Sequence, residues 1–267
     1  MKIAWLTDLH LNFLAPEQRQ RFLGTIAASG ADALAVGGDI AEAGSLCDIL
    51  RELDSAFQGA IYFVLGNHDY YHGGIRQVRA EVAQLHHDHP DLHWLPYGDP
   101  VPLSPSVVLA GHGGWGDARL GDYEGSRVML NDYVLIEELS GLDHGARRQR
   151  LADLGEEAAA YARQTLPGLL SRGLEVIFLT HAPPFEAACW HEGAISAKDW
   201  LPHFTCGALG CALTDLMAAH PEARMTVLCG HTHGQGKAQI APNLRVLTGG
   251  ATYKQPEIQC VFQIDTV

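Results

Sequence analysis

The sequence lacks the signatures of three common protein classes. It contains no run of ~18 uninterrupted apolar residues that could cross a membrane. The first apolar run leads into Thr7-Asp8-Leu9-His10 instead of a glycine-rich phosphate loop, and no Walker sequence occurs. We therefore expect no membrane partner, and we reject a dinucleotide-binding oxidoreductase and a P-loop enzyme. No secretory signal precedes Asp8, so we expect a cytoplasmic protein.

Basic residues are also scarce. The chain has 18 Lys and Arg against 31 Asp and Glu, which gives a formal net charge of -13, and the basic residues form no cluster. Such a surface repels nucleic-acid backbones and anionic membranes, so a long nucleic acid is a poor substrate. A small phosphate compound stays possible, because bound cations dominate the field around themselves.

Cysteine pairs are absent. None of the six cysteines belongs to a Cys-x-x-Cys motif, and 47% of the 267 residues are hydrophobic, so the chain needs no disulfide scaffold. Three cysteines in apolar segments are predicted to be buried thiols, namely Cys47, Cys229 and Cys260. A structural zinc site is an alternative for four other residues, whose spacing matches no common zinc knuckle: Cys189, His191, Cys206 and Cys211.

Short apolar runs alternate with helical patterns early in the chain. This alternation predicts parallel strands joined by right-handed crossovers. The runs predict strands at residues 3–7, 33–37, 61–65, 93–95, 107–109, 175–179, 225–229, 238–240, 244–247 and 258–264. Helical spacing of apolar residues predicts helices at residues 17–28, 46–57, 74–86, 134–139, 207–219 and 147–171, the last interrupted near Pro167.

The chain shows no internal division. It has no repeat and no low-complexity linker, so we predict a single domain over residues 1–267. Residues 113–145 are rich in Gly, Asp and charge, and we interpret them as an inserted excursion near the polar motifs described next. Residues 183–202 have no clear period and predict a long connection.

Five polar motifs follow predicted strands directly. Residues two apart in an extended segment point to the same side, which applies to Asp8 with His10 and to His231 with His233. We expect the motifs to meet at one edge of a sheet. They are Asp8-Leu9-His10, Gly38-Asp39, Gly66-Asn67-His68-Asp69, Thr180-His181 and Gly230-His231-Thr232-His233.

These carboxylate, imidazole and amide groups suit two divalent metal ions. The carboxylate of Asp39 can bridge both ions, and Asn67 offers a neutral oxygen. Mixed oxygen and nitrogen ligands favour Mn, Fe or Zn over Ca or Mg. Two such ions ~3.5–4 Å apart would turn a bridging water into a hydroxide that attacks a phosphoryl group in line.

Through these motifs the sequence resembles the calcineurin-like metallophosphoesterase family. The family pattern is D-x-H, G-D, G-N-H-[D/E], a lone H and G-H-x-H, and all five blocks occur in order between Asp8 and His233. The resemblance implies an α/β fold, a four-layer α-β-β-α sandwich of two mixed sheets flanked by helices, with a dinuclear metal site at the carboxyl ends of strands. It implies hydrolysis of a phosphate ester.

The resemblance also implies a role for each motif residue. His68 would face the substrate and protonate the leaving oxygen, and Asp69 would orient His68, a pairing that suits general acid chemistry near neutral pH. Glu42 replaces an Asp that many members carry, and we expect no effect of this on metal binding. One metal would be bound by Asp8, His10, Asp39 and His233, and the other by Asp39, Asn67, His181 and His231.

The substrate is open between related classes. A small phosphodiester or nucleotide is favoured because the chain is acidic, with a phosphomonoester as the alternative. A non-catalytic interaction module is a third hypothesis, but the presence of every ligand and of His68 favours an enzyme. The sequence does not determine the oligomeric state.

Several other residues could lie near the substrate. Trp115, in the glycine-rich segment 111–117 with His112, could stack on a base or sugar ring or could pack beneath a turn. Trp190 and His191 are expected to line the pocket from the connection after His181. Three further histidines lie at a helix end, which suits the helix dipole and solvent better than a metal site: His86, His87 and His89.

Overall fold

The first of two mixed β-sheets is built mainly from the start of the chain. The computed structural model describes residues 1–265. Four strands of this sheet are parallel and the fifth, from the end of the chain, pairs antiparallel with β1. In spatial order the strands are β13 (Cys260–Gln263), β1 (Lys2–Leu6), β2 (Ala33–Val36), β3 (Ala60–Phe63) and β4 (Leu92–Trp94).

The second sheet comes from the later part of the chain. Its central strands β12, β10, β7 and β6 are parallel, and an antiparallel strand closes each edge. The order is β11 (Gly236–Ala241), β12 (Leu244–Thr248), β10 (Arg224–Cys229), β7 (Glu175–Leu179), β6 (Val107–Gly111) and β5 (Val101–Pro102). A separate two-stranded ribbon joins β8 (Trp190–His191) to β9 (Ala194–Ile195).

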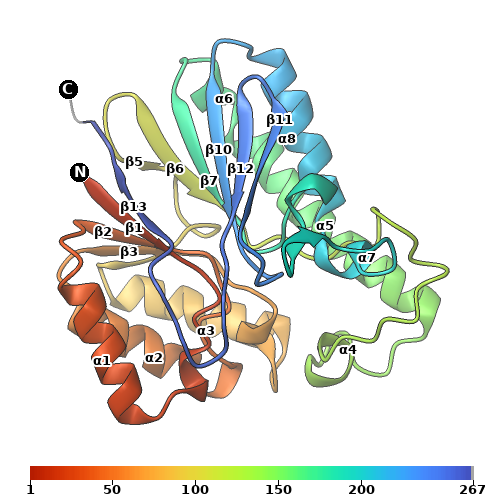
Figure 1. The fold of residues 1–267 in the computed structure, drawn as a ribbon, viewed down its shortest axis with the longest axis horizontal. Coiled ribbons are helices and arrows are strands. Elements are labelled where there is room, and N and C mark those ends of the chain that lie inside the picture. Colours follow the sequence, from red (N-terminus) through yellow and green to blue (C-terminus); the bar gives the residue numbers. More distant parts are fainter. Residues whose placement is uncertain (266–267) are drawn as a thin grey trace.

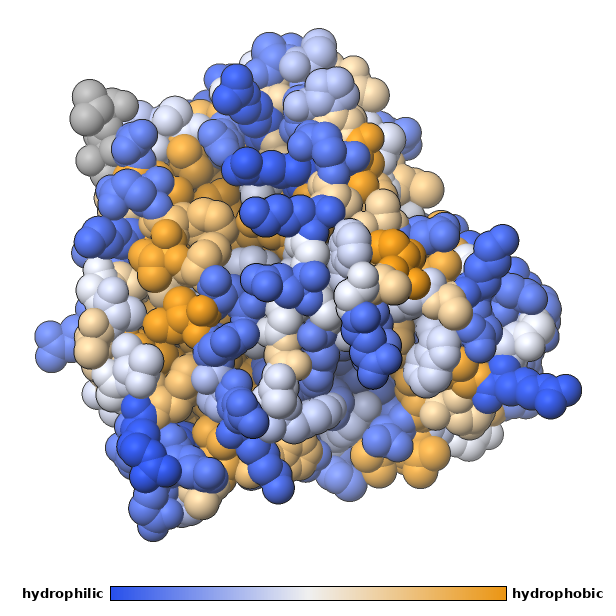
Figure 2. All heavy atoms as spheres, in the orientation of Figure 1, coloured by the Kyte–Doolittle hydropathy of each residue, from blue (hydrophilic) through white to orange (hydrophobic). Residues whose placement is uncertain are grey.

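Helices cover the outer face of each sheet. Figure 1 shows α1, α2 and α3 against the first sheet and α5, α6 and α8 beside the second, with α4 on the side of the molecule away from the two termini. Their bounds are α1 (Pro16–Ala27), α2 (Ala43–Ala56), α3 (Ile75–Asp88), α4 (Asp132–Leu135), α5 (His144–Thr165), α6 (Pro167–Leu170), α7 (Leu201–Phe204) and α8 (Gly207–Ala219). On the face shown in Figure 2, hydrophilic and hydrophobic side chains are intermixed, as at a solvent-facing surface.

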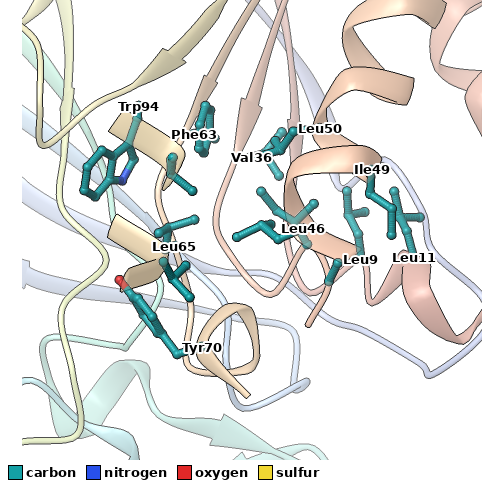
Figure 3. Close-up of a cluster of buried hydrophobic side chains, with 14 of the residues drawn as sticks. Leu9, Leu11, Val36, Leu46, Ile49, Leu50, Phe63, Leu65, Tyr70 and Trp94 are labelled. Atoms are coloured by element: carbon teal, nitrogen blue, oxygen red, sulfur yellow. The ribbon is translucent and has the colours of Figure 1, made fainter. Parts of the chain in front are cut away.

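Alternation along the strands explains the layers. In β1, Leu6 belongs to a core shared with the helices of the first sheet, whereas Trp5 belongs to a core shared with strands of the second sheet. Successive strand residues point to opposite faces, so one strand supplies both cores. In Figure 3, Leu46 and Leu50 of α2 meet Val36 of β2 in the outer core. A third core lies between the second sheet and its helices. The predicted four-layer α-β-β-α sandwich is therefore confirmed.

Most predicted elements form within a few residues of their expected bounds. The strand at 175–179 and the helix at 207–219 match as predicted, and the helix expected near Pro167 divides there into α5 and α6. The helix predicted at 134–139 is wrong in its extent. It is the single turn α4, because Ile136 leaves the helix to form a bridge with Gly73.

Candidate metal centre

The five polar motifs converge where the two sheets meet. β1, β2 and β3 of the first sheet and β7 and β10 of the second each end just before one motif. Two groups of side chains could each hold a metal ion. Within each group, every residue offers one ligand atom that lies within 4.8 Å of those of the other members, and Asp39 belongs to both groups. The first group is Asp8, His10, Asp39 and His233, and the second is Asp39, His181 and His231.

The backbone of the motifs is curled, and not extended as the sequence analysis predicted it to be. The φ angles of Asp8 (53°) and His10 (44°) are left-handed, as are those of His231 (71°) and His233 (57°). Asp39 has a φ of 51°. Non-glycine residues rarely adopt this conformation, and it concentrates at functional sites. The side chains meet because tight turns at the strand ends aim them inward.

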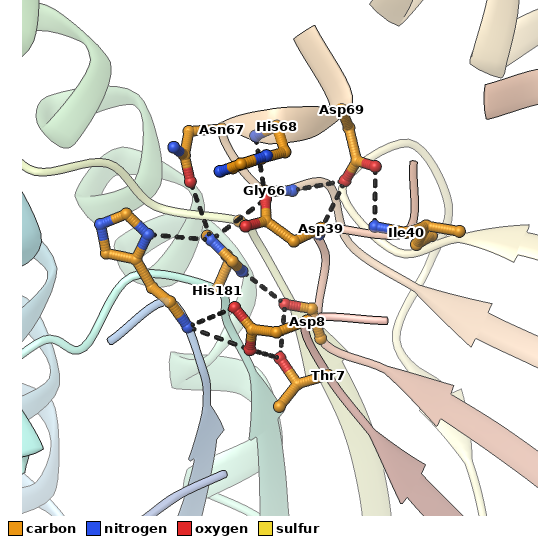
Figure 4. A network of polar contacts seen from close by, with 12 residues as sticks. Thr7, Asp8, Asp39, Ile40, Gly66, Asn67, His68, Asp69 and His181 are labelled. Atoms are coloured by element: carbon orange, nitrogen blue, oxygen red, sulfur yellow. Dashed lines mark hydrogen bonds and ion pairs between the residues drawn. The ribbon is translucent and has the colours of Figure 1, made fainter. Parts of the chain in front are cut away.

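Two glycines let these turns approach the carboxylates. A Cβ on Gly66 would collide with Oδ1 of Asp39, and a Cβ on Gly230 would collide with Oδ2 of Asp8. Backbone groups also fix both carboxylates. The N–H of His231 donates to Oδ1 of Asp8 at 2.9 Å, and the N–H of His68 donates to Oδ1 of Asp39 at 2.9 Å. The motifs from the two sheets are thus connected through the ligands themselves (Figure 4).

The hydrogen bonding of His181 tests whether a cation fits. Its Nδ1 must donate to the carbonyl oxygen of Gly37, 2.9 Å away, since a carbonyl can only accept. Its Nε2 then faces Oδ1 of Asn67 at 3.1 Å, Nδ1 of His231 at 3.1 Å and Oδ1 of Asp39 at 3.4 Å. A cation between these atoms would satisfy all of them at once, so the arrangement fits a metal ion. Burial opposes protonation of His181, but Asp39 and Asp8 raise its pKa.

The first group of ligands shows the same convergence. Nε2 of His10 lies 3.2 Å from Nε2 of His233 and 3.7 Å from Oδ2 of Asp39. Burial lowers the pKa of His10 to about 2, so its imidazole is neutral, which is the form that binds metal. Burial and the neighbouring Asp8 raise the pKa of Asp39 to about 7, although His181 opposes the shift. Two divalent cations would remove the repulsion between the carboxylates.

Asn67 is oriented by residues that the sequence did not single out. Its Nδ2 donates to Oδ1 of Asp132 at 2.8 Å and to the hydroxyl of Tyr71 at 3.2 Å. The Tyr71 hydroxyl also donates to Oδ1 of Asp132, at 2.7 Å. The amide oxygen of Asn67 therefore points toward His181, as a ligand oxygen should. Asp132 lies in the 113–145 excursion, far from Asn67 in sequence, and no local signal identified it.

The predicted pairing of Asp69 with the His68 ring does not form. The Asp69 carboxylate is fully buried and accepts hydrogen bonds from four backbone N–H groups, at 2.8–2.9 Å. These groups belong to Asp39, Ile40, Ala41 and Gly66. Figure 4 shows Asp69 directed at these loops and away from the His68 ring. Asp69 therefore holds the loop after β2 against the loop after β3.

Aromatic contacts, not a carboxylate, position the His68 ring. It lies against Tyr71, with ring centroids 4.2 Å apart, and edge-on to His10, at 4.6 Å. Burial lowers the pKa of His68 to about 4, although Asp132 opposes the shift. An anionic phosphoryl group beside the ring would favour its protonated form.

Comparison with known proteins agrees with this geometry. Residues 1–235 match the model of the calcineurin-like phosphoesterase family. The chain belongs to this family. The family is one of dinuclear, metal-dependent phosphoester hydrolases, and the site provides a ligand cluster suited to two metals. A comparison with curated proteins gave no match.

Solved structures share the fold of this calcineurin-like phosphoesterase at low sequence identity. One is the phosphopantetheinyl hydrolase PptH from Mycobacterium tuberculosis, with 16% identity, a TM-score of 0.66, and coverage of 95% of this chain and 90% of that one. Another is a dimetal phosphatase from Danio rerio, with 12% identity, a TM-score of 0.57, and coverage of 94% and 87%.

A pocket of about 310 Å³ opens over the ligands of this calcineurin-like phosphoesterase. His68 and four of the predicted ligands line it, namely Asp39, Asn67, His231 and His233. The excursion supplies one wall through residues 129–132, and Tyr253 and Phe204 line it from two other segments. His191 also lines the pocket, held by a contact of 2.9 Å between its Nδ1 and the carbonyl oxygen of Thr232.

Three predicted substrate contacts lie outside this pocket. Trp115 is buried and packs beside Tyr70, so the packing alternative is the one observed. His112 lines a different cavity, of about 350 Å³, and its Nδ1 accepts a hydrogen bond from the N–H of Gly114 at 3.1 Å. The Trp190 ring covers Gly236 and does not line the pocket.

The other candidate metal clusters do not assemble among residues 1–265. Cys189 and Cys206 are buried whereas Cys211 is exposed, and no group of potential ligands includes them or His191. The histidines near Pro90 form no such group either, and Nδ1 of His89 pairs with Oδ2 of Asp54 at 2.9 Å. Within the same residues, no helix has the length and apolarity needed to cross a membrane.

Proposed function

We propose that this protein hydrolyses a small phosphodiester with the help of two divalent metal ions, Mn, Fe or Zn. The observation that carries the proposal is the pair of ligand groups that share Asp39, with all ligand atoms of each group within 4.8 Å of one another. Residues 1–267 would act as one domain, a proposal supported by the fact that both sheets contribute ligands.

Each ligand group is proposed to bind one metal ion. Asp8, His10, Asp39 and His233 would hold one ion, and Asp39, Asn67, His181 and His231 the other. When bound, the two ions would activate the attacking water and neutralise charge on the phosphoryl group. Asp132 accepts a 2.8 Å hydrogen bond from Nδ2 of Asn67, which would keep the amide oxygen available to the second ion.

His68 is proposed as the general acid. Its ring lies beside His10 and lines the pocket, so it can donate a proton to the leaving oxygen of a bound ester. The His68 ring lies against Tyr71, and the backbone N–H of His68 donates to Asp39, so the proposed proton donor is connected directly to a proposed metal ligand. Asp69 is proposed to position both His68 and Asp39, because its carboxylate holds together the two loops that carry them.

The test uses two chromogenic esters. Metal-free protein is assayed with bis-p-nitrophenyl phosphate and with p-nitrophenyl phosphate, with and without added Mn. Mn-restored cleavage of the diester over the monoester is the expected result. Preference for the monoester would make the protein a phosphatase, and no turnover of either ester with two metals bound would refute the proposal.

A further inference from the structure

One aromatic pair stands beside the first ligand group. The Tyr253 ring lies over His10 and His233, with centroid distances of 4.6 and 5.0 Å. Phe13 meets Tyr253 edge-on at 5.8 Å. Both side chains reach solvent, with 46% of Tyr253 and 37% of Phe13 exposed. An apolar surface is therefore available next to the predicted site of one metal.

A second aromatic pair stands beside the other ligand group. Phe204 meets the His231 ring edge-on, with centroids 5.1 Å apart and planes at 90°. Trp200 stacks on Phe204 at 5.2 Å and 29°, and 41% of Trp200 is exposed. The two pairs come from segments before and within α7 and from loops after His10 and after β12. Each metal group thus has its own aromatic neighbour.

The pocket wall between the pairs carries no lysine or arginine. The lining residues of the metal pocket, all of them among residues 1–265, include neither Lys nor Arg. Their acidic members are Asp39 and Asp132, and both are buried. Met129 adds an apolar surface that is 60% exposed. A negatively charged substituent would find no lysine or arginine among these lining residues, whereas a flat apolar group would find ring faces.

We propose that the pocket selects phosphodiesters with two uncharged, aromatic or apolar substituents, one against Tyr253 and Phe13 and the other against Phe204 and Trp200. This inference rests on the proposed function. A diester carries a single negative charge, which the two metals alone can balance. A monoester dianion, or an ester with further phosphates, brings further charge, and the lining residues provide no lysine or arginine to pair it.

The experiment compares three diesters with the same leaving group. They are methyl, phenyl and 4-carboxyphenyl p-nitrophenyl phosphate, so the chemical step is shared and only the second substituent differs. Stacking contributes ~0.5–1.5 kcal/mol beyond burial. We expect kcat/KM to be about tenfold higher for the phenyl ester than for either other ester, mainly through KM.

Variants identify the surfaces responsible. The ratio of kcat/KM for the phenyl ester to that for the methyl ester should fall in Tyr253→Ala or in Phe204→Ala, whichever removes the surface that holds the second substituent, and Tyr253→Phe should retain the ratio. Tyr97→Ala is the matched control, since Tyr97 is 62% exposed and stacks on Trp94 outside the pocket. The phenyl preference should be unchanged in this control.

The outcomes separate the two proposals. Equal kcat/KM for the methyl and phenyl esters, or a phenyl preference that both alanine variants keep, would overturn the aromatic selection. Equal kcat/KM for the phenyl and carboxyphenyl esters would overturn the charge selection. No turnover of any diester with two metals bound would instead refute the proposed function, and this inference with it.

Discussion

The candidate metal ligands together with His68, here called the floor, and the aromatic residues beside them, here called the rim (Phe13, Trp200, Phe204 and Tyr253), differ in burial and in backbone. Asp8 and Asp39 are 2% and 1% exposed and lie in left-handed turns directly after strands, whereas Tyr253 and Trp200 are 46% and 41% exposed and lie in connecting segments. Backbone N–H groups hold the carboxylates of the floor, while the rim residues are held by ring contacts. On the proposed function, the buried floor would determine the reaction and the exposed rim would determine the substrate.

Changes to the floor should therefore have the largest effects. Asp39→Asn removes the charge of the one residue shared by both ligand groups with little change in volume. Loss of both metal sites forfeits several kcal/mol of transition-state stabilisation, so kcat/KM should fall by about 10⁴-fold. Metal content and diester hydrolysis should be measured together, with Asp48→Asn on the surface of α2 as the control. Full activity with two bound metals would remove Asp39 from the centre.

His68 lies at the floor but is not expected to bind metal. His68→Ala should lower kcat by about 10³-fold, as for loss of a general acid, while two metals stay bound. The loss should be smaller for methyl p-nitrophenyl phosphate than for methyl phenyl phosphate, because p-nitrophenolate leaves with less need of a proton. The exposed His87, changed to Ala, serves as control. An equal loss for both leaving groups would contradict the assignment.

Metal removal should destabilise the folded protein through the floor residues and independently of the rim residues. Asp8 and Asp39 belong to the same ligand group and repel each other without cations. At a free metal concentration 100 times Kd, binding stabilises the folded state by about 2.7 kcal/mol. The melting temperature should fall on chelation in the native protein and in Tyr253→Ala alike. An unchanged melting temperature in metal-free protein would contradict this expectation.

Asp132 lies in the wall of the pocket and is hydrogen-bonded to Asn67 of the floor, so its substitution should weaken metal binding less than the loss of a ligand would. Asp132→Ala removes the hydrogen bonds that orient Asn67 and Tyr71. Loss of such a supporting contact costs about 10–100-fold in metal affinity or activity. Titration of activity with Mn should show a weaker second binding event, whereas Asp122→Ala in the same excursion should bind as the native protein does. Unaltered metal affinity in Asp132→Ala would show that Asn67 needs no such support.

The same contrast explains what the sequence could predict. Each ligand of the floor directly follows a buried apolar strand, so periodicity and residue type were enough to identify it, as for Asp39 after Ala33–Val36. The mutual arrangement of Asp8 and His10 was inferred from an extended geometry that the chain does not adopt. The two side chains nevertheless lie in one group of potential ligands, because tight turns aim both of them inward.

Residues whose role depends on distant partners were not predictable. Asp69 follows His68 in sequence, yet its partners are backbone N–H groups of two loops. Asp132 and Tyr253 reach the pocket from segments that have no polar motif and no apolar period. Trp115 has the composition of a stacking residue, but tertiary packing buries it beside Tyr70. Such contacts are determined by the fold and not by local pattern.

The most direct test of a two-metal diesterase is hydrolysis of bis-p-nitrophenyl phosphate as Mn is added to metal-free protein in measured equivalents per chain. Activity should rise until two equivalents are bound and then remain constant, and Asp39→Asn should show no such rise. Full activity at one equivalent, or none with two equivalents bound, would contradict the account.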